Sequence, residues 1–322
     1  MELGTSVEIG LFHNSAYLPT GPIDGRRLTM GLRSRVLAPL TRFAPAPTGY
    51  LHLGHIVNAI FVWGLARSLN GRVLLRIEDH DRQRSRPEYE TALLDDLEWL
   101  GFEPDIFAPP AFRSGATPGR QSDRDAGYRE ALAPLIARGL VYGCDCTRQQ
   151  IDGPVYLGRC RERGLPLADG LGWRLRVEPH QERFDDAVLG PQQQSPAQQV
   201  GDLLIRDRLG NWTYQWAAST DDTLQNIGLV VRGEDLLEST GRQIMLARLL
   251  GRTEPPVFAH HPLLMKSSTQ KLSKSDGDTG VCDLRDAGWD PPRVIGLAAH
   301  LVGLQTAPLP RSAAEVAAFF AE

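Results

Sequence analysis

One feature of the sequence limits the fold more than any other. In the first third of the chain, apolar segments with the spacing of a strand alternate with apolar segments with the spacing of a helix. The run at 36–44 predicts a buried strand, and the Pro-Ala-Pro-Thr-Gly sequence at 45–49 predicts a turn, since proline fixes φ and glycine permits positive φ. Helical spacing follows over 55–69, then a strand at 72–79 and a proline-led helix at 87–100. Strands alternating with helices predict an α/β fold with a parallel sheet and crossover helices.

The alternation is interrupted between about residues 104 and 200, where a helix at 128–138 is followed by closely spaced cysteines and a Gln/Pro-rich stretch. Afterwards we expect strands at 202–207, 212–217 and 227–232, a helix at 239–250, a loop at 266–276, and helices at 291–302 and 312–321. These patterns predict a peripheral N-terminal extension (1–35), the first half of a nucleotide-binding domain (36–103), an insertion with a metal site (104–200), the second half of that domain (201–280) and a helical C-terminal segment (281–322).

Composition narrows the class of protein. With 322 residues and 42% hydrophobic residues, the chain can form one large or two moderate domains. We expect a cytoplasmic protein without membrane contact, because no apolar run reaches the ~18 residues of a membrane span and the first residues do not resemble a signal peptide. We also expect a monomer. The net charge of −4 argues against a generally basic surface but is compatible with a local RNA-binding face.

The turn between the first strand and the first helix contains the sequence His-Leu-Gly-His, from His52 to His55. A helix N-terminus has unpaired N–H groups and a positive dipole end, both of which favour phosphate. Gly54 would let a flat ring approach the backbone, and both histidines can donate to an α-phosphate. The alternative is a structural turn with incidental histidines.

A second motif, Lys-Leu-Ser-Lys-Ser, lies about 220 residues downstream in a polar stretch. Two lysines with intervening serines suit a loop that contacts a triphosphate, where Lys274 would neutralise charge on departing pyrophosphate. Alone, the motif would more simply be a solvated basic loop; its combination with the histidine motif favours ATP binding. The residues concerned are Lys271, Ser273, Lys274 and Ser275.

Three cysteines, Cys144, Cys146 and Cys160, lie within 17 positions. Thiolates this close in sequence predict a tetrahedral zinc site. Chemistry alone does not decide the fourth ligand, which could be His180 or Asp145. The alternative is three reduced cysteines near a surface. Cys282 stands apart and is expected to be structural.

The two motifs resemble the HIGH and KMSKS signatures of class I aminoacyl-tRNA synthetases. Four further segments, at 42–49, 76–81, 214–217 and 231–236, closely resemble the glutamyl-tRNA synthetase catalytic domain. The resemblance extends from about Arg42 to about Gly303. It implies a Rossmann-like (HUP-type) parallel sheet with an inserted, zinc-containing acceptor-type subdomain and a short helical C-terminal segment.

The resemblance also implies a glutamate-binding pocket. Arginines can bind carboxylates through paired N–H groups, a glutamate can hold the ammonium group and a tyrosine hydroxyl can close the pocket, although either arginine could instead form a structural ion pair. Ala46 stands where the family usually has serine, so one hydroxyl contact is missing, and glutaminyl enzymes have glutamate there. The residues at the implied contacts are Arg42, Phe43, Ala44, Pro45, Ala46, Glu78, Tyr214 and Arg232.

Shortened members of the family place a Cys-x-Cys, a tyrosine and a final cysteine in the insertion, so Tyr156 is the implied fourth ligand of one structural Zn²⁺. Only about 47 residues follow Ser275, and we therefore expect no anticodon-binding domain. This points to the glutamyl-queuosine tRNA(Asp) synthetases, which activate L-glutamate with ATP and Mg²⁺, release pyrophosphate and transfer glutamate to queuosine in the anticodon loop of tRNA(Asp). His52, His55 and Lys274 would then stabilise charge that develops during activation.

Three other functions compete with this interpretation. A truncated glutamyl-tRNA synthetase would charge tRNA(Glu), but the expected lack of an anticodon reader argues against it. Another nucleotidyltransferase on the same fold would not need the glutamate-type pocket or the zinc insertion. A catalytically inactive tRNA-binding paralogue would be free to lose His52, His55 and Lys274, all of which are present.

Overall fold

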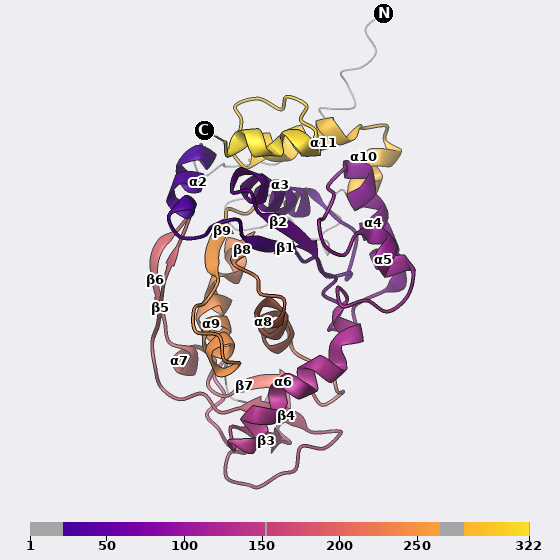
Figure 1. Cartoon of the computed structure of the whole chain (residues 1–322). Helices are drawn as coiled ribbons and strands as arrows, with labels where there is room; N and C mark the ends of the chain where they lie inside the picture. Colours follow the sequence, from indigo (N-terminus) through magenta and orange to yellow (C-terminus); the bar gives the residue numbers. More distant parts are fainter. Residues whose placement is uncertain (1–21, 152, 265–279, 322) are drawn as a thin grey trace, which may run out of the picture.

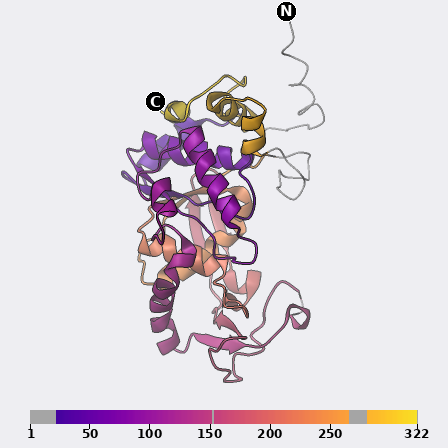
Figure 2. The same ribbon diagram turned by 90° about the vertical axis from the view of Figure 1, so that its right-hand side faces the viewer.

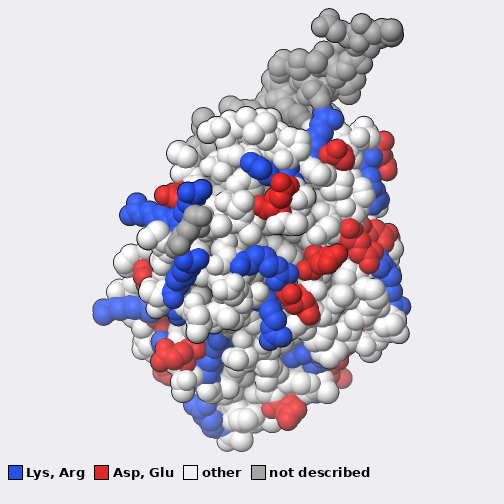
Figure 3. Space-filling view, turned by 45° about the horizontal axis from the view of Figure 1, so that its top comes forward, with Lys and Arg blue, Asp and Glu red and all other residues white. Residues whose placement is uncertain are grey.

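Parallel strands with their covering helices form one end of the molecule, and a small antiparallel sheet forms the other (Figures 1 and 2). The computed structural model describes residues 22–151, 153–264 and 280–321. None of the helices in these ranges is both long and apolar enough to cross a lipid bilayer. Figure 3 shows one face of the molecule, on which acidic and basic side chains are interspersed.

The first end is built from two pairs of parallel strands. β1 (Leu40–Phe43) pairs with β2 (Arg72–Leu75), and β8 (Leu229–Gly233) pairs with β9 (Val257–His261). The amide of Gly228 donates to the carbonyl oxygen of Leu40 (2.8 Å), which places β8 beside β1. The expected α/β architecture with parallel strands is therefore confirmed.

Helix α3 (Leu53–Ser68) connects β1 to β2 and is apolar around most of its circumference. It is enclosed because α11 (Pro291–Leu301) and the 3₁₀ segment η5 (Ala313–Phe319) pack on it, as Figure 1 shows. Gly64 makes this contact possible, since a Cβ there would lie 2.2 Å from the ring of Phe320.

Residues before the first strand contribute to the same core. Helix α2 (Gly25–Arg33) begins after Asp24, whose carboxylate accepts from the amide of Arg27. Leu32 is fully buried, and Leu28 nearly so, among residues of the main apolar core. The described part of the expected peripheral extension is therefore packed on the core; the sequence pattern did not predict this helix.

Helix α4 (Pro87–Leu100) has the predicted bounds: Pro87 opens it, and Gly101, with a φ of 78°, ends it. The chain then descends through α5 (Pro109–Arg113), the 3₁₀ turn η1 (Gln121–Arg124) and α6 (Asp125–Ala137). These elements lead from the parallel strands to the other end of the molecule (Figure 1).

The inserted sheet is antiparallel, with the strand order β3 (Val141–Cys144), β4 (Gly172–Leu175), β7 (Leu203–Arg206). It has its own apolar core, to which Trp173 and Trp212 belong. Since β7 pairs with β4, the inserted structure extends past the predicted boundary at residue 200. The short elements η2 (Arg148–Gln150) and α7 (Pro196–Val200) lie between its strands in the chain.

A hairpin of β5 (Glu182–Asp186) and β6 (Gly190–Gln194) returns along the side of the molecule. It lies against β9 and helix α9 (Thr240–Leu249), although its residues fall inside the predicted insertion (Figure 1). The hairpin therefore connects the inserted region to the parallel strands.

One predicted strand is wrong. Residues 212–217 were expected to be extended, but helix α8 (Tyr214–Leu224) begins within them. Aromatic residues at alternate positions fit a strand, whereas Trp212 and Trp216 pack in the core of the insertion and the helix continues into Asp221 and Asp222. The remaining elements in the described part of the chain are η3 (Glu234–Ser239) and α10 (Val281–Asp286).

Candidate active site

The turn before α3 is held by its two histidines. His52 is the N-cap residue, and its Nδ1 accepts from the amide of Gly54 (3.1 Å). The amide of His52 in turn donates to Nδ1 of His55 (3.1 Å). Because both Nδ1 atoms accept, a neutral ring at either position carries its proton on Nε2. A Cβ at Gly54 would lie 2.9 Å from the imidazole of His52, so glycine here accommodates that ring.

A cavity of about 450 Å³ opens beside this turn, between the ends of β1 and β8. It brings together every described residue that the sequence analysis assigned to ATP or glutamate. These are Arg42, Phe43, Ala44, Pro45, Ala46, His52, Gly54, His55, Glu78, Tyr214 and Arg232. Lys271, Ser273, Lys274 and Ser275 lie outside the described residues.

The described residues on either side of the undescribed range 265–279 lie near this cavity. Leu264, the last described residue before it, lines the cavity. Gly280, the first described residue after it, forms an antiparallel bridge with His52, and Val281 donates its amide to the carbonyl of Leu51 (2.8 Å).

Asp222 of α8 organises one wall of the cavity. Its Oδ1 accepts from Nε of Arg42 (3.1 Å) and Nη1 of Arg76 (2.8 Å). Arg76 also donates from Nη2 to Oε1 of Glu78 (3.0 Å), which fixes that carboxylate. Burial favours the protonated form of Asp222, but Arg42 and Arg76 outweigh this effect and hold its pKa below the ordinary value. Arg76 thus fixes the position of Glu78 in the wall of the cavity.

Arg232 of β8 has a different environment. It is 4% exposed, and its guanidinium donates to the Gln243 side-chain oxygen (2.6 Å) and the hydroxyls of Thr240 (2.8 Å) and Tyr214 (3.4 Å). Among the described residues, no carboxylate forms an ion pair with it. Burial lowers the pKa of Arg232. A buried cation with neutral partners favours an anionic ligand.

Comparisons with known proteins show the family of the chain. The family model for tRNA synthetases class I (E and Q), catalytic domain, matches residues 40–154 and 172–308. The chain belongs to this family of class I synthetases for glutamate and glutamine. It is 41% identical to the glutamyl-Q tRNA(Asp) synthetase of Symbiobacterium thermophilum, over 84% of this chain and 88% of that protein. It is 38% identical to the glutamyl-Q tRNA(Asp) synthetase of Rhodobacter capsulatus, over 80% of this chain and all of that protein.

Among solved structures, the fold of this class I synthetase is similar to a glutamate-tRNA synthetase from Elizabethkingia anophelis. The TM-score is 0.73 at 25% identity. The alignment covers 88% of this chain and 65% of that one, so this synthetase spans less than two-thirds of the length of that structure.

The cysteine cluster of this class I synthetase lies in the inserted region. The Sγ atoms of Cys144, Cys146 and Cys160 all lie within 4.8 Å of one another. The hydroxyl oxygen of Tyr156 is 3.4 Å from Sγ of Cys144 and 3.6 Å from Sγ of Cys146, and it accepts from the amide of Cys160 (3.0 Å). The family match omits residues 155–171, which include Tyr156 and Cys160.

The structure distinguishes the candidates for a fourth ligand. His180 is bonded to the Glu178 carbonyl (2.8 Å) and to Glu182 (3.0 Å), away from the sulfurs. Asp145 lies 3.4 Å from Sγ of Cys160 but is paired with Arg163. Of these three candidates, the Tyr156 oxygen contacts two of the sulfurs and Asp145 contacts one.

Sequence reasoning missed the residues that hold the predicted ones in place. Arg76 lies in a segment that was quoted only for its resemblance, and Asp222 falls in a helix whose first residues were predicted as a strand. The pair of acidic residues at 221 and 222 in an otherwise uncharged helix was the available signal, since buried carboxylates need cationic partners.

Proposed function

We propose that this synthetase activates L-glutamate with ATP and transfers it to queuosine in the anticodon loop of tRNA(Asp). The observation that carries the proposal is the single cavity in which the turn at His52 meets Arg42, Glu78 and Arg232. The names of the two relatives that match most of their own length support the choice of acceptor.

The cavity is suited to glutamate because its charges complement those of the amino acid. Glu78 would bind the ammonium group, while Arg42 and Arg232 would bind carboxylates. Arg42 already forms an ion pair with Asp222, whereas the partners of Arg232 among the described residues are neutral. Arg232 therefore provides the cation with which a substrate carboxylate can pair most favourably. Glutamine lacks the side-chain carboxylate of glutamate, so it can offer a negative charge to only one of the two arginines and should bind more weakly.

ATP would bind at the N-terminus of α3. In the activation step, a glutamate carboxylate oxygen attacks the α-phosphate of ATP, and pyrophosphate leaves. The Nε2–H groups of His52 and His55 would donate to the phosphate as negative charge develops. We assign Lys271 and Lys274 to the same phosphates on their sequence alone. Mg²⁺ would neutralise phosphate charge when it accompanies ATP.

Cys144, Cys146, Cys160 and Tyr156 would hold a structural zinc ion. A Zn–S distance of ~2.3 Å in a tetrahedron corresponds to sulfurs ~3.8 Å apart, and Cys146 and Cys160 place theirs 3.5 Å apart. All four side chains are buried and come from the inserted region, away from the cavity at the α3 turn. The ion would therefore stabilise the insertion.

The first test is pyrophosphate exchange with ATP and glutamate, glutamine or aspartate, followed by transfer of labelled glutamate to RNA. We expect exchange with glutamate and transfer to queuosine-containing tRNA(Asp), but not to tRNA(Asp) that lacks queuosine. Labelling of tRNA(Glu) instead would show a minimal glutamyl-tRNA synthetase. The absence of any exchange or transfer would contradict the proposal.

Matched variants connect this activity to the cavity. Arg232→Gln should raise the KM for glutamate about 10- to 100-fold, because it removes charge-assisted hydrogen bonds. Arg183→Gln alters an exposed arginine on the hairpin and should have no effect. Lys274→Ala should abolish exchange. Equal KM values in the two arginine variants would refute the assignment of Arg232.

A further inference from the structure

A chain of hydrogen bonds leads from the β5–β6 hairpin to the candidate glutamate pocket. Oδ2 of Asp186 lies 2.6 Å from Nδ1 of His260, and Nε2 of the same ring lies 3.0 Å from Nε of Arg232. The three residues are 2%, 0% and 4% exposed, respectively. They come from β5, β9 and β8, so the contact joins three elements.

The chemistry of the partners fixes the state of the imidazole. A guanidinium has only donors, so Nε2 of His260 must accept from Nε–H of Arg232. The proton of a neutral ring is then on Nδ1, where it is donated to the carboxylate of Asp186. The Thr240 hydroxyl, 3.2 Å from the same Nε2, also accepts from Nη2 of Arg232. Together these contacts determine the orientation of the guanidinium.

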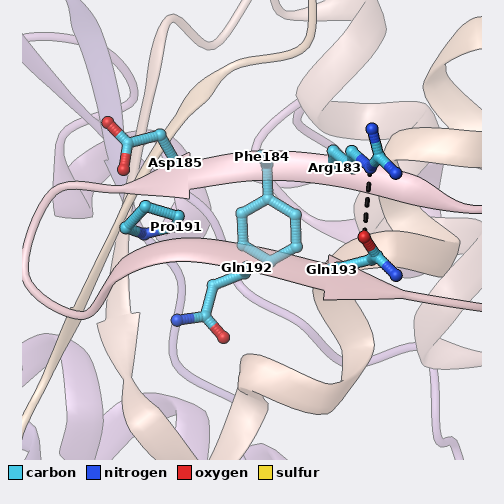
Figure 4. Close-up of a pocket in the computed structure, with 6 residues that line it drawn as sticks. All are labelled: Arg183, Phe184, Asp185, Pro191, Gln192 and Gln193. Carbon is cyan, nitrogen blue, oxygen red and sulfur yellow. Dashed lines mark hydrogen bonds between the residues drawn. The ribbon is translucent and has the colours of Figure 1, made fainter.

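Asp186 is itself held rigidly. Its Oδ1 accepts from the amides of Val188 (2.9 Å), Leu189 (2.9 Å) and His260 (3.3 Å), which leaves Oδ2 for the imidazole. Asp185, the preceding residue, is exposed and pairs with Arg35. Figure 4 shows Asp185 opposite Pro191 on the hairpin.

We infer that Asp186 and His260 are positioning residues that orient Arg232 to receive a carboxylate of the amino-acid substrate. Neither residue lines the cavity, and so neither would touch the substrate. The inference rests on the proposed function, because it assigns Arg232 to glutamate. It adds a contribution from the inserted hairpin to amino-acid recognition.

The local electrostatics agree with a neutral imidazole. Burial lowers the pKa of His260, and Arg232 and Arg42 act in the same direction. Burial alone would raise the pKa of Asp186, but the hydrogen bonds from His260 and from the amides of Leu189 and Val188 lower it overall. The pair therefore consists of a carboxylate and a neutral ring at neutral pH.

Asp186→Asn provides the sharpest test. The amide oxygen can keep the three backbone hydrogen bonds, which turns the NH₂ group towards Nδ1 of His260. Nδ1 must then accept, so the ring proton moves to Nε2 and faces Nε–H of Arg232, donor against donor. We expect the KM for glutamate in pyrophosphate exchange to rise about 10- to 100-fold while the KM for ATP stays the same. The matched control, Asp185→Asn, should leave both values unchanged.

A second substitution separates this mechanism from simple loss of structure. In His260→Gln, the side-chain oxygen can still accept from Arg232, whereas in His260→Leu no acceptor remains. Glutamate binding should be near normal in the glutamine variant and weakened in the leucine variant. Asp186→Asn added to His260→Gln should have little further effect, because the ring whose tautomer it inverts is gone.

Nitrogen NMR of the histidine side chains reads the tautomer directly. We expect a proton on Nδ1 of His260 in the wild type and on Nε2 in Asp186→Asn. An inverted tautomer with an unchanged KM for glutamate would overturn the inference, as would equal effects of Asp186→Asn with and without His260. If the wild type itself neither bound nor activated glutamate, the proposed function would fail and the inference with it.

Discussion

The carboxylate of Asp96 is buried in the contact between α4 and α10, and its replacement by asparagine should stabilise the protein. Asp96 is fully buried, and neither of its oxygens accepts a hydrogen bond among the described residues. Nη1 of Arg285 lies 3.4 Å from Oδ1. Burial, the largest effect, raises the pKa of Asp96 from 3.8 to about 6; Asp95, Asp283 and Asp286 act in the same direction, and Arg285 opposes them.

The sign of the pH dependence follows from this pKa. A carboxyl group whose pKa is raised by folding binds its proton more tightly in the folded state, so stability falls as pH rises from about 4 to about 6. Above both pKa values the ionised carboxylate costs up to about 3 kcal/mol of unfolding free energy. At pH 5 the same relation gives roughly half that cost. Screening by solvent around the half-exposed Arg285 reduces both values.

Asp96→Asn keeps the shape of the side chain and removes the ionisation. We expect it to raise the free energy of unfolding by about 1–3 kcal/mol at pH 8, and by about half as much at pH 5. Urea unfolding followed by tryptophan fluorescence at the two pH values measures this difference. The exposed neighbour in Asp95→Asn is the matched control and should show no comparable gain.

A loss of stability in Asp96→Asn at pH 8 would refute the reasoning, because it would show that the ion pair with Arg285 outweighs the burial of the charge. An equal gain at both pH values would also contradict it, since the effect would then not arise from ionisation.

Three further predictions concern other parts of the molecule. Gly64→Ala should destabilise the protein by about 1–3 kcal/mol in thermal unfolding, because its Cβ would overlap the ring of Phe320. The control Gly127→Ala has open space around it in α6 and should be neutral or stabilising in the same assay. Metal analysis should find about one zinc ion per chain in the wild type and in Cys282→Ser, but none in Cys146→Ser. Asp222→Asn should lower the free energy of unfolding by about 3–5 kcal/mol in urea, since Arg42 and Arg76 lose their shared counter-charge; a change below 1 kcal/mol would contradict that role.

The sequence predicted those helices and strands that are determined by neighbouring residues along the chain. Pro87 and Gly101 indicated the bounds of α4. The alternation of strand-like and helix-like apolar segments indicated the parallel strands. The segment 212–217 misled the prediction because its three aromatic residues, at alternate positions, look like one face of a strand, while the helix that contains Trp216 is stabilised by distant packing. Tertiary contacts decided that element against its local pattern.

The candidate site divides in the same way. The residues around the cavity could be named because each belongs to a short, characteristic segment. His260 and Asp186 could not, since they are 74 positions apart and meet only after the hairpin has folded back onto β9. Nothing in either neighbourhood indicates the other, and the role of the pair depends on which nitrogen faces Arg232.

The bridge made by Asp222 has a consequence for the order of folding. It joins Arg42 across 180 positions and Arg76 across 146. Closing chain segments of this length is entropically unfavourable, so contacts of this kind tend to form late. Before it forms, the two arginines and Asp222 remain hydrated, because burying any of them alone is unfavourable. The pocket wall should therefore assemble in one of the last steps of folding. Binding of a ligand to this wall would then indicate that the segments containing Arg42 and Arg76 have come into contact with the segment containing Asp222.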